Sequence, residues 1–213
     1  YPVSHVVVHP DYTRISKAET DSSGNVKPIQ TGLDSDIALL YLTRPVANAS
    51  FADLANKADM ESIEARLAEL GINLPAAAAP VASYVPVIVH DNVAYISGQL
   101  PFVDGTLVTG RLGEDVTVDR GIAAARACGM MILAQLKSAD IPLDRVARII
   151  KLGAFVSSAA NFSDQPKVAN GASELMFDVF GEIGRHARSA VGVPVLPLLA
   201  AVEVDAIIAL HPA

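Results

Sequence analysis

The sequence predicts an α+β fold in which a mixed β-sheet carries two helices on one face, preceded by a short β-type appendage. Two observations predict this class. Apolar residues recur at helical spacing over 117–137 and again over 172–183, whereas four other segments after residue 84 alternate or run apolar like strands. The order is therefore β-β-α-β-α-β-β, with strands mostly in hairpins, which favours helices gathered on one side of the sheet.

The amino-acid composition excludes several classes of protein. The 213 residues are 51% hydrophobic, enough for one packed domain with an appendage. The formal net charge of −7 argues against a nucleic-acid-binding surface. Charges or prolines interrupt every apolar run well before the ~18 residues of a membrane span. One cysteine, Cys128, excludes an internal disulfide and fits a reducing compartment, so we expect a cytoplasmic protein.

The pattern changes near Met60 and predicts an appendage over 1–59 and a domain over 60–213. Segments 6–12 and 34–42 resemble the middle of a trypsin-like serine protease, a resemblance that covers 1–46 and implies the triad aspartate at Asp36. The segments that carry the triad histidine and the nucleophile loop are missing, and neither His5 nor His9 takes the histidine's place. Without base and nucleophile we expect no acyl transfer, and a two-strand arm is the plainer interpretation.

From Met60 the elements follow in order. The apolar spacing over 62–70 predicts a helix that ends at Gly71. An Ala-rich linker over 75–80 comes next, and 85–96 predicts a hairpin that turns at Asp91-Asn92. A loop through Gly105 and Gly110 leads to the long helix.

The long helix is predicted to open at Thr117 or Asp119 and to end near Lys137. Seven small or apolar residues form its inner stripe: Ile122, Ala125, Cys128, Gly129, Ile132, Leu133 and Leu136. The stripe makes Cys128 a core residue. A strand over 146–156 and a helix over 172–183 follow.

The last stretch bears most directly on function. Strands over 187–193 and 202–208 flank a Pro-containing turn near Pro197, and the simplest prediction is an antiparallel hairpin. Ala190 would then lie opposite Glu203, with Arg188 two residues further along the same face. A planar guanidinium fits a substrate carboxylate, and a carboxylate can move a proton or hold a water.

Ordered motifs carry a family resemblance. They are VAYISGQLP at 93–101, AAARAC at 123–128, VANGASEL at 168–175 and the terminal HARSAVGV at 186–193. From about 60 to 210 the chain resembles the RidA (YjgF-like) family, in its chorismate-mutase-like branch. The resemblance implies that family's fold and a homotrimer built around the open sheet face, with sites between subunits.

The resemblance also implies site residues. Arg188 falls on the arginine that binds the substrate carboxylate, and Glu203, fifteen residues on, falls on the family's acidic position. Tyr84 and the backbone of Ser97 and Gly98 would shape the pocket.

Each candidate also has a structural interpretation. Arg188 could be a surface cation that pairs with Asp205 or Glu182. Asn170 could be either a helix N-cap or a substrate-binding amide, and we favour the N-cap. Ser97-Gly98-Gln99 could be a structural device in which Gly98 permits close backbone approach and Gln99 satisfies buried backbone groups. His186 could be a general base, although a cap or surface role is favoured.

The resemblance implies an enzyme that hydrolyses enamines or imines of amino acids to 2-oxo acids and ammonia. Many active members carry Cys where this chain has Ala190, so a binding module that senses carboxylated metabolites is the alternative. Chorismate-mutase-type chemistry is a second alternative, and endoribonuclease activity is disfavoured by the acidic balance. No pattern predicts a metal or a cofactor.

Overall fold

The computed structural model describes residues 18–20, 26–28, 62–79 and 83–212, and the chain divides into two units, Tyr1–Met60 and Glu61–Ala213. In the first unit β1 (Ala18–Thr20) pairs antiparallel with β2 (Val26–Pro28). The protease-like segments 6–12 and 34–42, with His5, His9 and Asp36, lie outside the described residues.

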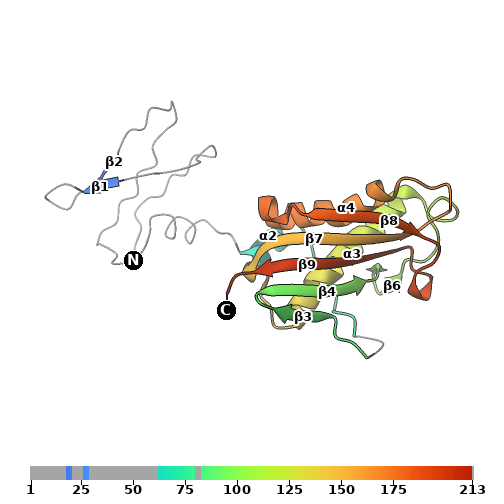
Figure 1. Ribbon diagram of the computed structural model, residues 1–213, viewed down its shortest axis with the longest axis horizontal. Helices are drawn as coiled ribbons and strands as arrows, with labels where there is room; N and C mark the ends of the chain where they lie inside the picture. The colour runs from blue at the N-terminus through green and yellow to red at the C-terminus, as the bar shows by residue number, and fades with distance from the viewer. Residues whose placement is uncertain (1–17, 21–25, 29–61, 80–82, 213) are drawn as a thin grey trace. The chain divides into compact units, whose positions relative to one another are not determined.

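A five-stranded mixed sheet forms the second unit, as the sequence predicts (Figure 1). Its spatial order is β3-β4-β9-β7-β8. Its strands are β3 (Val87–His90), β4 (Val93–Gln99), β7 (Val146–Ser157), β8 (Ala187–Val193) and β9 (Val202–Leu210).

The predicted terminal hairpin is wrong. β8 pairs parallel with β7, with Leu152 in register with Arg188, because the chain crosses over between them through a helix. β9 then lies on the other side of β7 and pairs antiparallel with both β7 and β4. The local sequence pattern shows only two strands on either side of a turn. It does not show that β9, which buries every second residue, lies between β4 and β7 and shares its core face with both.

Three helices flank the sheet. α2 (Ile63–Glu69) begins at the cap Ser62 and ends before Gly71, whose φ is +65°, as predicted. α3 (Val118–Ser138) begins at Thr117, whose hydroxyl accepts from the Arg120 N–H at 3.3 Å. α4 spans Gln165–Phe180 and is followed by the short 3-10 helix η2 (Gly181–Gly184). α3 and α4 lie behind the sheet in Figure 1, so the helices cover one face, as the sequence predicts.

α4 starts seven residues earlier than predicted, because Asn170-Gly171 reads as a helix start but lies in its second turn. A Cβ at Gly171 would stand 1.9 Å from the Ile122 carbonyl oxygen. The glycine therefore serves the close approach of α4 to α3 rather than a turn.

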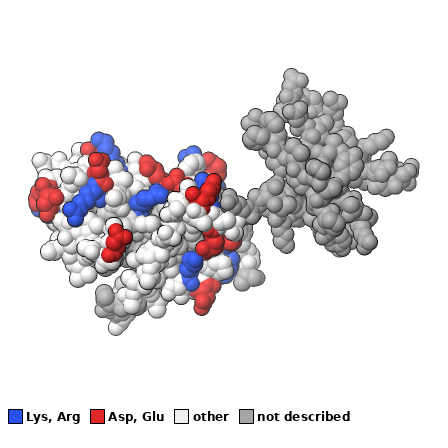
Figure 2. Space-filling model, turned by 180° about the vertical axis from the view of Figure 1, so that it is seen from behind, with Lys and Arg blue, Asp and Glu red and all other residues white. Residues whose placement is uncertain are grey.

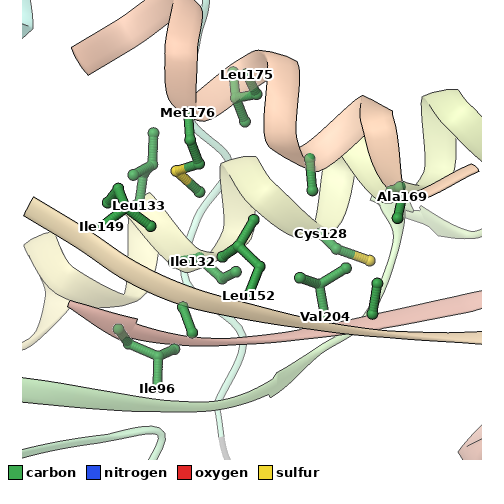
Figure 3. Close-up of a cluster of buried hydrophobic side chains, with 14 of the residues drawn as sticks. Ile96, Cys128, Ile132, Leu133, Ile149, Leu152, Ala169, Leu175, Met176 and Val204 are labelled. Atoms are coloured by element: carbon green, nitrogen blue, oxygen red, sulfur yellow. The ribbon is translucent and has the colours of Figure 1, made fainter. Parts of the chain in front are cut away.

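The core fills the space between the helices and the sheet (Figure 3). Cys128 is fully buried there with Ile132, Leu152 and Val204 around it, which confirms its assignment to the core. Burial raises the pKa of its thiol, so Cys128 is no ready nucleophile.

Two turns differ in how well they were predicted. The β3–β4 hairpin turns at Asp91 (φ 49°) and Asn92 (φ 59°), as expected for a two-residue turn. A second hairpin, β5 (Phe102–Val103) with β6 (Thr106–Leu107), replaces part of the predicted loop. The sequence shows the Asp104-Gly105 turn. Its two-residue strands are too short to show the alternating apolar pattern that predicts a strand, so the hairpin was not predicted.

Candidate functional site

Arg188 lies on β8, an edge strand of the sheet, and its side chain is directed to the helix-covered face. Its register partner Leu152 is fully buried on that face. The Nη1 group donates to Asn170 Oδ1 and to Ser173 Oγ, both at 2.9 Å, and Nη2 donates to the Pro166 carbonyl at 3.1 Å. All three acceptors lie on α4 and all are neutral, so they fix the guanidinium without cancelling its charge.

The arrangement leaves part of the guanidinium fork for another acceptor. Arginine has five N–H donors, and the bonds to described residues use three. Nε–H and one N–H of Nη2 remain, on neighbouring nitrogens, which is the side-on geometry for a carboxylate held by two bonds.

The ion pair that the sequence allowed for Arg188 does not form. Glu182 accepts instead from Arg185 Nε at 2.9 Å, and Asp205 accepts from the Gly153 N–H at 3.0 Å. Among the described residues four other arginines pair with carboxylates: Arg66, Arg111, Arg126 and Arg185. Arg188 therefore differs from them in being held by neutral groups.

Asn170 is not an N-cap. It lies inside α4, whose N-cap residue is Asp164, and its amide oxygen faces Arg188. The structure thus brings together Arg188 and Asn170, two residues that the sequence singled out separately.

Ser173 joins this cluster and was missed by sequence reasoning. It lies three residues after Asn170, which on a helix is the same face, and that spacing was the available signal. Its hydroxyl is 3.0 Å from His186 Nε2, and His186 Nδ1 is 2.7 Å from the Gly184 carbonyl.

His186 is partly buried, and its contact with the carbonyl of Gly184, the last residue of η2, is of the capping kind that the sequence favoured. Because a carbonyl oxygen only accepts, Nδ1 carries the proton in the neutral ring and Nε2 accepts from Ser173. Burial lowers the pKa of His186 and the charge of Arg188 lowers it further, although the bond to Gly184 opposes both. Burial and the charge of Arg188 both shift the imidazole toward its neutral form.

Glu203 lies on the other face of the sheet. It is in register with Phe155, and both alternate with core residues. A Cβ at Gly98 would stand 1.9 Å from Glu203 Oε1, so the β4 backbone approaches this carboxylate closely. Burial raises the pKa of Glu203 and Asp205 raises it further, which favours a carboxyl that can exchange protons.

The Ser97-Gly98-Gln99 segment has the structural role that the sequence allowed. Gln99 Nε2 donates to the Ser97 carbonyl at 3.0 Å and to its hydroxyl at 3.1 Å, and Gln99 Oε1 accepts from Gln135 at 3.2 Å. The β4–β9 register shifts between Ile96 and Gln99, which re-aims the backbone at Gly98. Tyr84 precedes β3 and is 47% exposed.

The structure therefore separates what the predicted hairpin would have joined. Arg188 groups with Asn170 on the helix-covered face, whereas Gly98 groups with Glu203 on the open face. Ala190 packs against the hydrophobic core from the same strand as Arg188. Within one chain the guanidinium and the carboxylate do not flank a common site.

Charge and metal ligands give no competing site in the described part of the chain. Figure 2 shows one face of the molecule, on which acidic and basic side chains are interspersed rather than gathered by sign. Within residues 18–20, 26–28, 62–79 and 83–212, no group of three or more His, Cys, Asp or Glu could hold a metal. None of the described helices is both long enough and apolar enough to span a bilayer.

Comparison with known proteins places the fold among proteins of one family. Residues 64–209 match the model of a family described as "YjgF/chorismate_mutase-like, putative endoribonuclease". Protein TCP17 of Trypanosoma cruzi is 52% identical over 151 residues, which are 70% of this chain and 94% of TCP17. The crystal structure of Atu1372 from Agrobacterium tumefaciens, a protein of unknown function, is similar at 48% identity and a TM-score of 0.65, over 71% of this chain and 94% of that one.

The crystal structure of a protein from Shewanella oneidensis MR-1, described as "a putative endoribonuclease", is similar at 36% identity and a TM-score of 0.68, over 70% of this chain and 100% of its own. The family match over residues 64–209 spans the five-stranded sheet except for the last residue of β9.

Proposed function

The chain belongs to the YjgF/chorismate-mutase-like family, and from this membership we propose that it hydrolyses imines derived from 2-amino acids. Water adds to the imine carbon, the C–N bond breaks, and the nitrogen leaves as ammonia with a 2-oxo acid as the other product. Imines hydrolyse readily, so positioning and charge placement supply most of what an enzyme must add.

Arg188 carries the proposal. Its guanidinium is fixed by three neutral acceptors on α4 and keeps two adjacent N–H groups for a carboxylate. A 2-imino acid presents such a carboxylate next to the carbon that water attacks. Asn170, which binds the same Nη1 group, borders this site.

Glu203 is the proposed proton carrier. Its pKa is raised by burial and by Asp205, so it is closer to neutrality than an ordinary glutamate and can both accept a proton from water and return it. Gly98 lets the backbone lie against it, and Ser97 and Tyr84 complete the proposed wall.

We propose that the complete site forms between copies in a homotrimer, which the family resemblance implies. Two observations support this. Arg188 and Glu203 lie on different faces of the sheet, so one chain does not place both around a small substrate. The open face also exposes large apolar side chains, with Ile88 at 56%, Tyr95 at 48% and Val191 at 45%.

The test measures pyruvate affinity by calorimetry and imine hydrolysis by a coupled assay that consumes the 2-oxo acid. We expect Arg188→Ala to lose both binding and turnover, and Arg188→Lys to recover little because the two-bond geometry is lost. Glu203→Gln should keep binding and lose roughly 100-fold or more in turnover.

Arg185→Ala is the matched control, because this neighbouring exposed arginine pairs with Glu182 and should leave both readouts unchanged. Pyruvate binding by Arg188→Ala that equals the parent's would show that Arg188 is not the carboxylate site. Tight binding without turnover in the parent would instead favour the alternative, a sensor of carboxylated metabolites, which the thiol-free Ala190 position favours.

A further inference from the structure

Arg188 is connected through one hydroxyl to a histidine that can change its charge. Ser173 Oγ accepts from Arg188 Nη1 at 2.9 Å and lies 3.0 Å from His186 Nε2. The far side of the imidazole is fixed by the Gly184 carbonyl at 2.7 Å from Nδ1. Guanidinium, hydroxyl, imidazole and carbonyl therefore form one directed chain from β8 through α4 to η2.

The direction of each bond follows from the groups. The carbonyl fixes the proton on Nδ1, so neutral His186 can only accept at Nε2, and Ser173 must donate to it. The hydroxyl hydrogen is thereby committed, and the Ser173 oxygen presents its lone pairs to Arg188. In this state Ser173 orients the guanidinium and leaves its Nε–H edge for a ligand.

We propose that Ser173 and His186 are positioning residues for Arg188, and that uptake of a proton by His186 strengthens carboxylate binding at the Arg188 site. This inference rests on the proposed function, since it takes Arg188 as the group that binds the substrate carboxylate.

The physical reason is charge. A protonated His186 places a second positive charge one hydroxyl away from the guanidinium, and the bound carboxylate reduces the repulsion between the two. Linkage requires the reverse effect as well, so a bound carboxylate raises the pKa of His186.

The other groups around the imidazole do not supply this effect. From α4 it meets the Ser173 hydroxyl, from η2 the Gly184 carbonyl, and from β8 the charge of Arg188. The charged neighbours Glu182 and Arg185 are paired with each other, and Arg185 lies 4.3 Å from the centre of the Phe177 ring.

The experiment measures the affinity of the full chain for pyruvate, which stays ionised throughout, between pH 8 and pH 5. We expect the parent to bind about tenfold more tightly at pH 5, within the usual range of coupling between two sites. His186→Gln keeps hydrogen-bonding groups but cannot titrate. Its affinity for pyruvate should therefore lack the tenfold gain between pH 8 and pH 5. Any slope that Glu203 contributes remains in both proteins and cancels in the comparison.

His90→Gln is the matched control, because His90 has a side chain that is 79% exposed and lies at the β3–β4 turn. It should keep the parent profile. In NMR titrations, saturating pyruvate should raise the pKa of His186.

The positioning role of Ser173 is tested with two variants. Ser173→Ala removes the hydroxyl and should weaken pyruvate binding at every pH and reduce its pH dependence, whereas Ser173→Thr keeps the hydroxyl and should restore both. Parent-like affinity and pH profile in Ser173→Ala would overturn the positioning role.

Two failures are distinguishable. If the parent binds no pyruvate at any pH, the carboxylate site is wrong, and the inference fails with it. If the parent binds pyruvate but His186→Gln keeps the same pH profile, the carboxylate site stands and the inference alone is overturned.

Discussion

At the scale of single residues, the two candidate catalytic groups differ in whether the surrounding structure favours their charged form. The guanidinium of Arg188 is fixed by neutral oxygens, whereas the carboxyl of Glu203 is destabilised in its charged form by burial and by Asp205. A group whose charged form the fold does not stabilise, at a close backbone approach, is typical of functional positions.

This difference gives a stability prediction. Because the pKa of Glu203 is raised above the usual 4.5, its contribution to stability is fully present below pH 4.5 and is lost as the pH rises through the folded-state value. Glu203→Gln should therefore stabilise the protein at pH 8, by on the order of 1 kcal/mol, and have little effect at pH 4. Urea unfolding at both pH values measures this.

The matched control is Glu174→Gln, at an exposed position on α4. A gain in stability that is equal at both pH values would show that the effect of Glu203→Gln is packing and not charge.

At the scale of elements, the position of α4 decides where the Arg188 acceptors lie. Pro166, Asn170 and Ser173 all belong to α4, and Gly171 sets how closely that helix meets α3. The helix pair therefore positions the site as well as the core.

We predict that Gly171→Ala destabilises the protein. Alanine gains up to about 1 kcal/mol in helix propensity, but its Cβ would stand 1.9 Å from the Ile122 carbonyl oxygen, a backbone atom that cannot rotate away. Overpacking of this kind costs about 1–3 kcal/mol, so a net loss is expected in urea unfolding, together with weaker pyruvate binding because the acceptors move. Lys167→Ala, on the exposed side of α4, is the control, and an increase in stability for Gly171→Ala would contradict the close helix approach.

At the scale of the whole molecule, α2 belongs with the sheet domain. Arg66 Nε donates to the Asp178 carbonyl at 3.0 Å, Asp144 accepts from the Ile63 N–H at 2.8 Å, and Lys137 pairs with Glu64 at 2.8 Å. These contacts tie α2 to α3, α4 and the turn before β7.

We therefore predict that a fragment of residues 60–213 folds by itself, since it keeps α2 and every contact of the sheet described here. Thermal unfolding should show one cooperative transition, and sedimentation should show an assembly larger than a single chain. As a control, a fragment that starts at residue 72 lacks α2 and should unfold at a lower temperature. Absence of a cooperative transition in the 60–213 fragment would show that residues 1–59 contribute to the core.

The sequence by itself determined the α+β class, the order of the five strands and three helices of the sheet domain, and most residues of the candidate site, but not the short β5–β6 hairpin or the start of α4. Periodicity and caps are local properties, so Ser62, Thr117 and the Asp91-Asn92 turn could be predicted from their immediate neighbours. Only the tertiary structure decided that β7 separates β8 from β9, that Arg188 and Glu203 face opposite sides of the sheet, and that Ser173 and His186 meet behind the guanidinium. Strand partners depend on a crossover through α4 and on which strands complete the core face of β9, and these long-range contacts leave no mark in the local pattern.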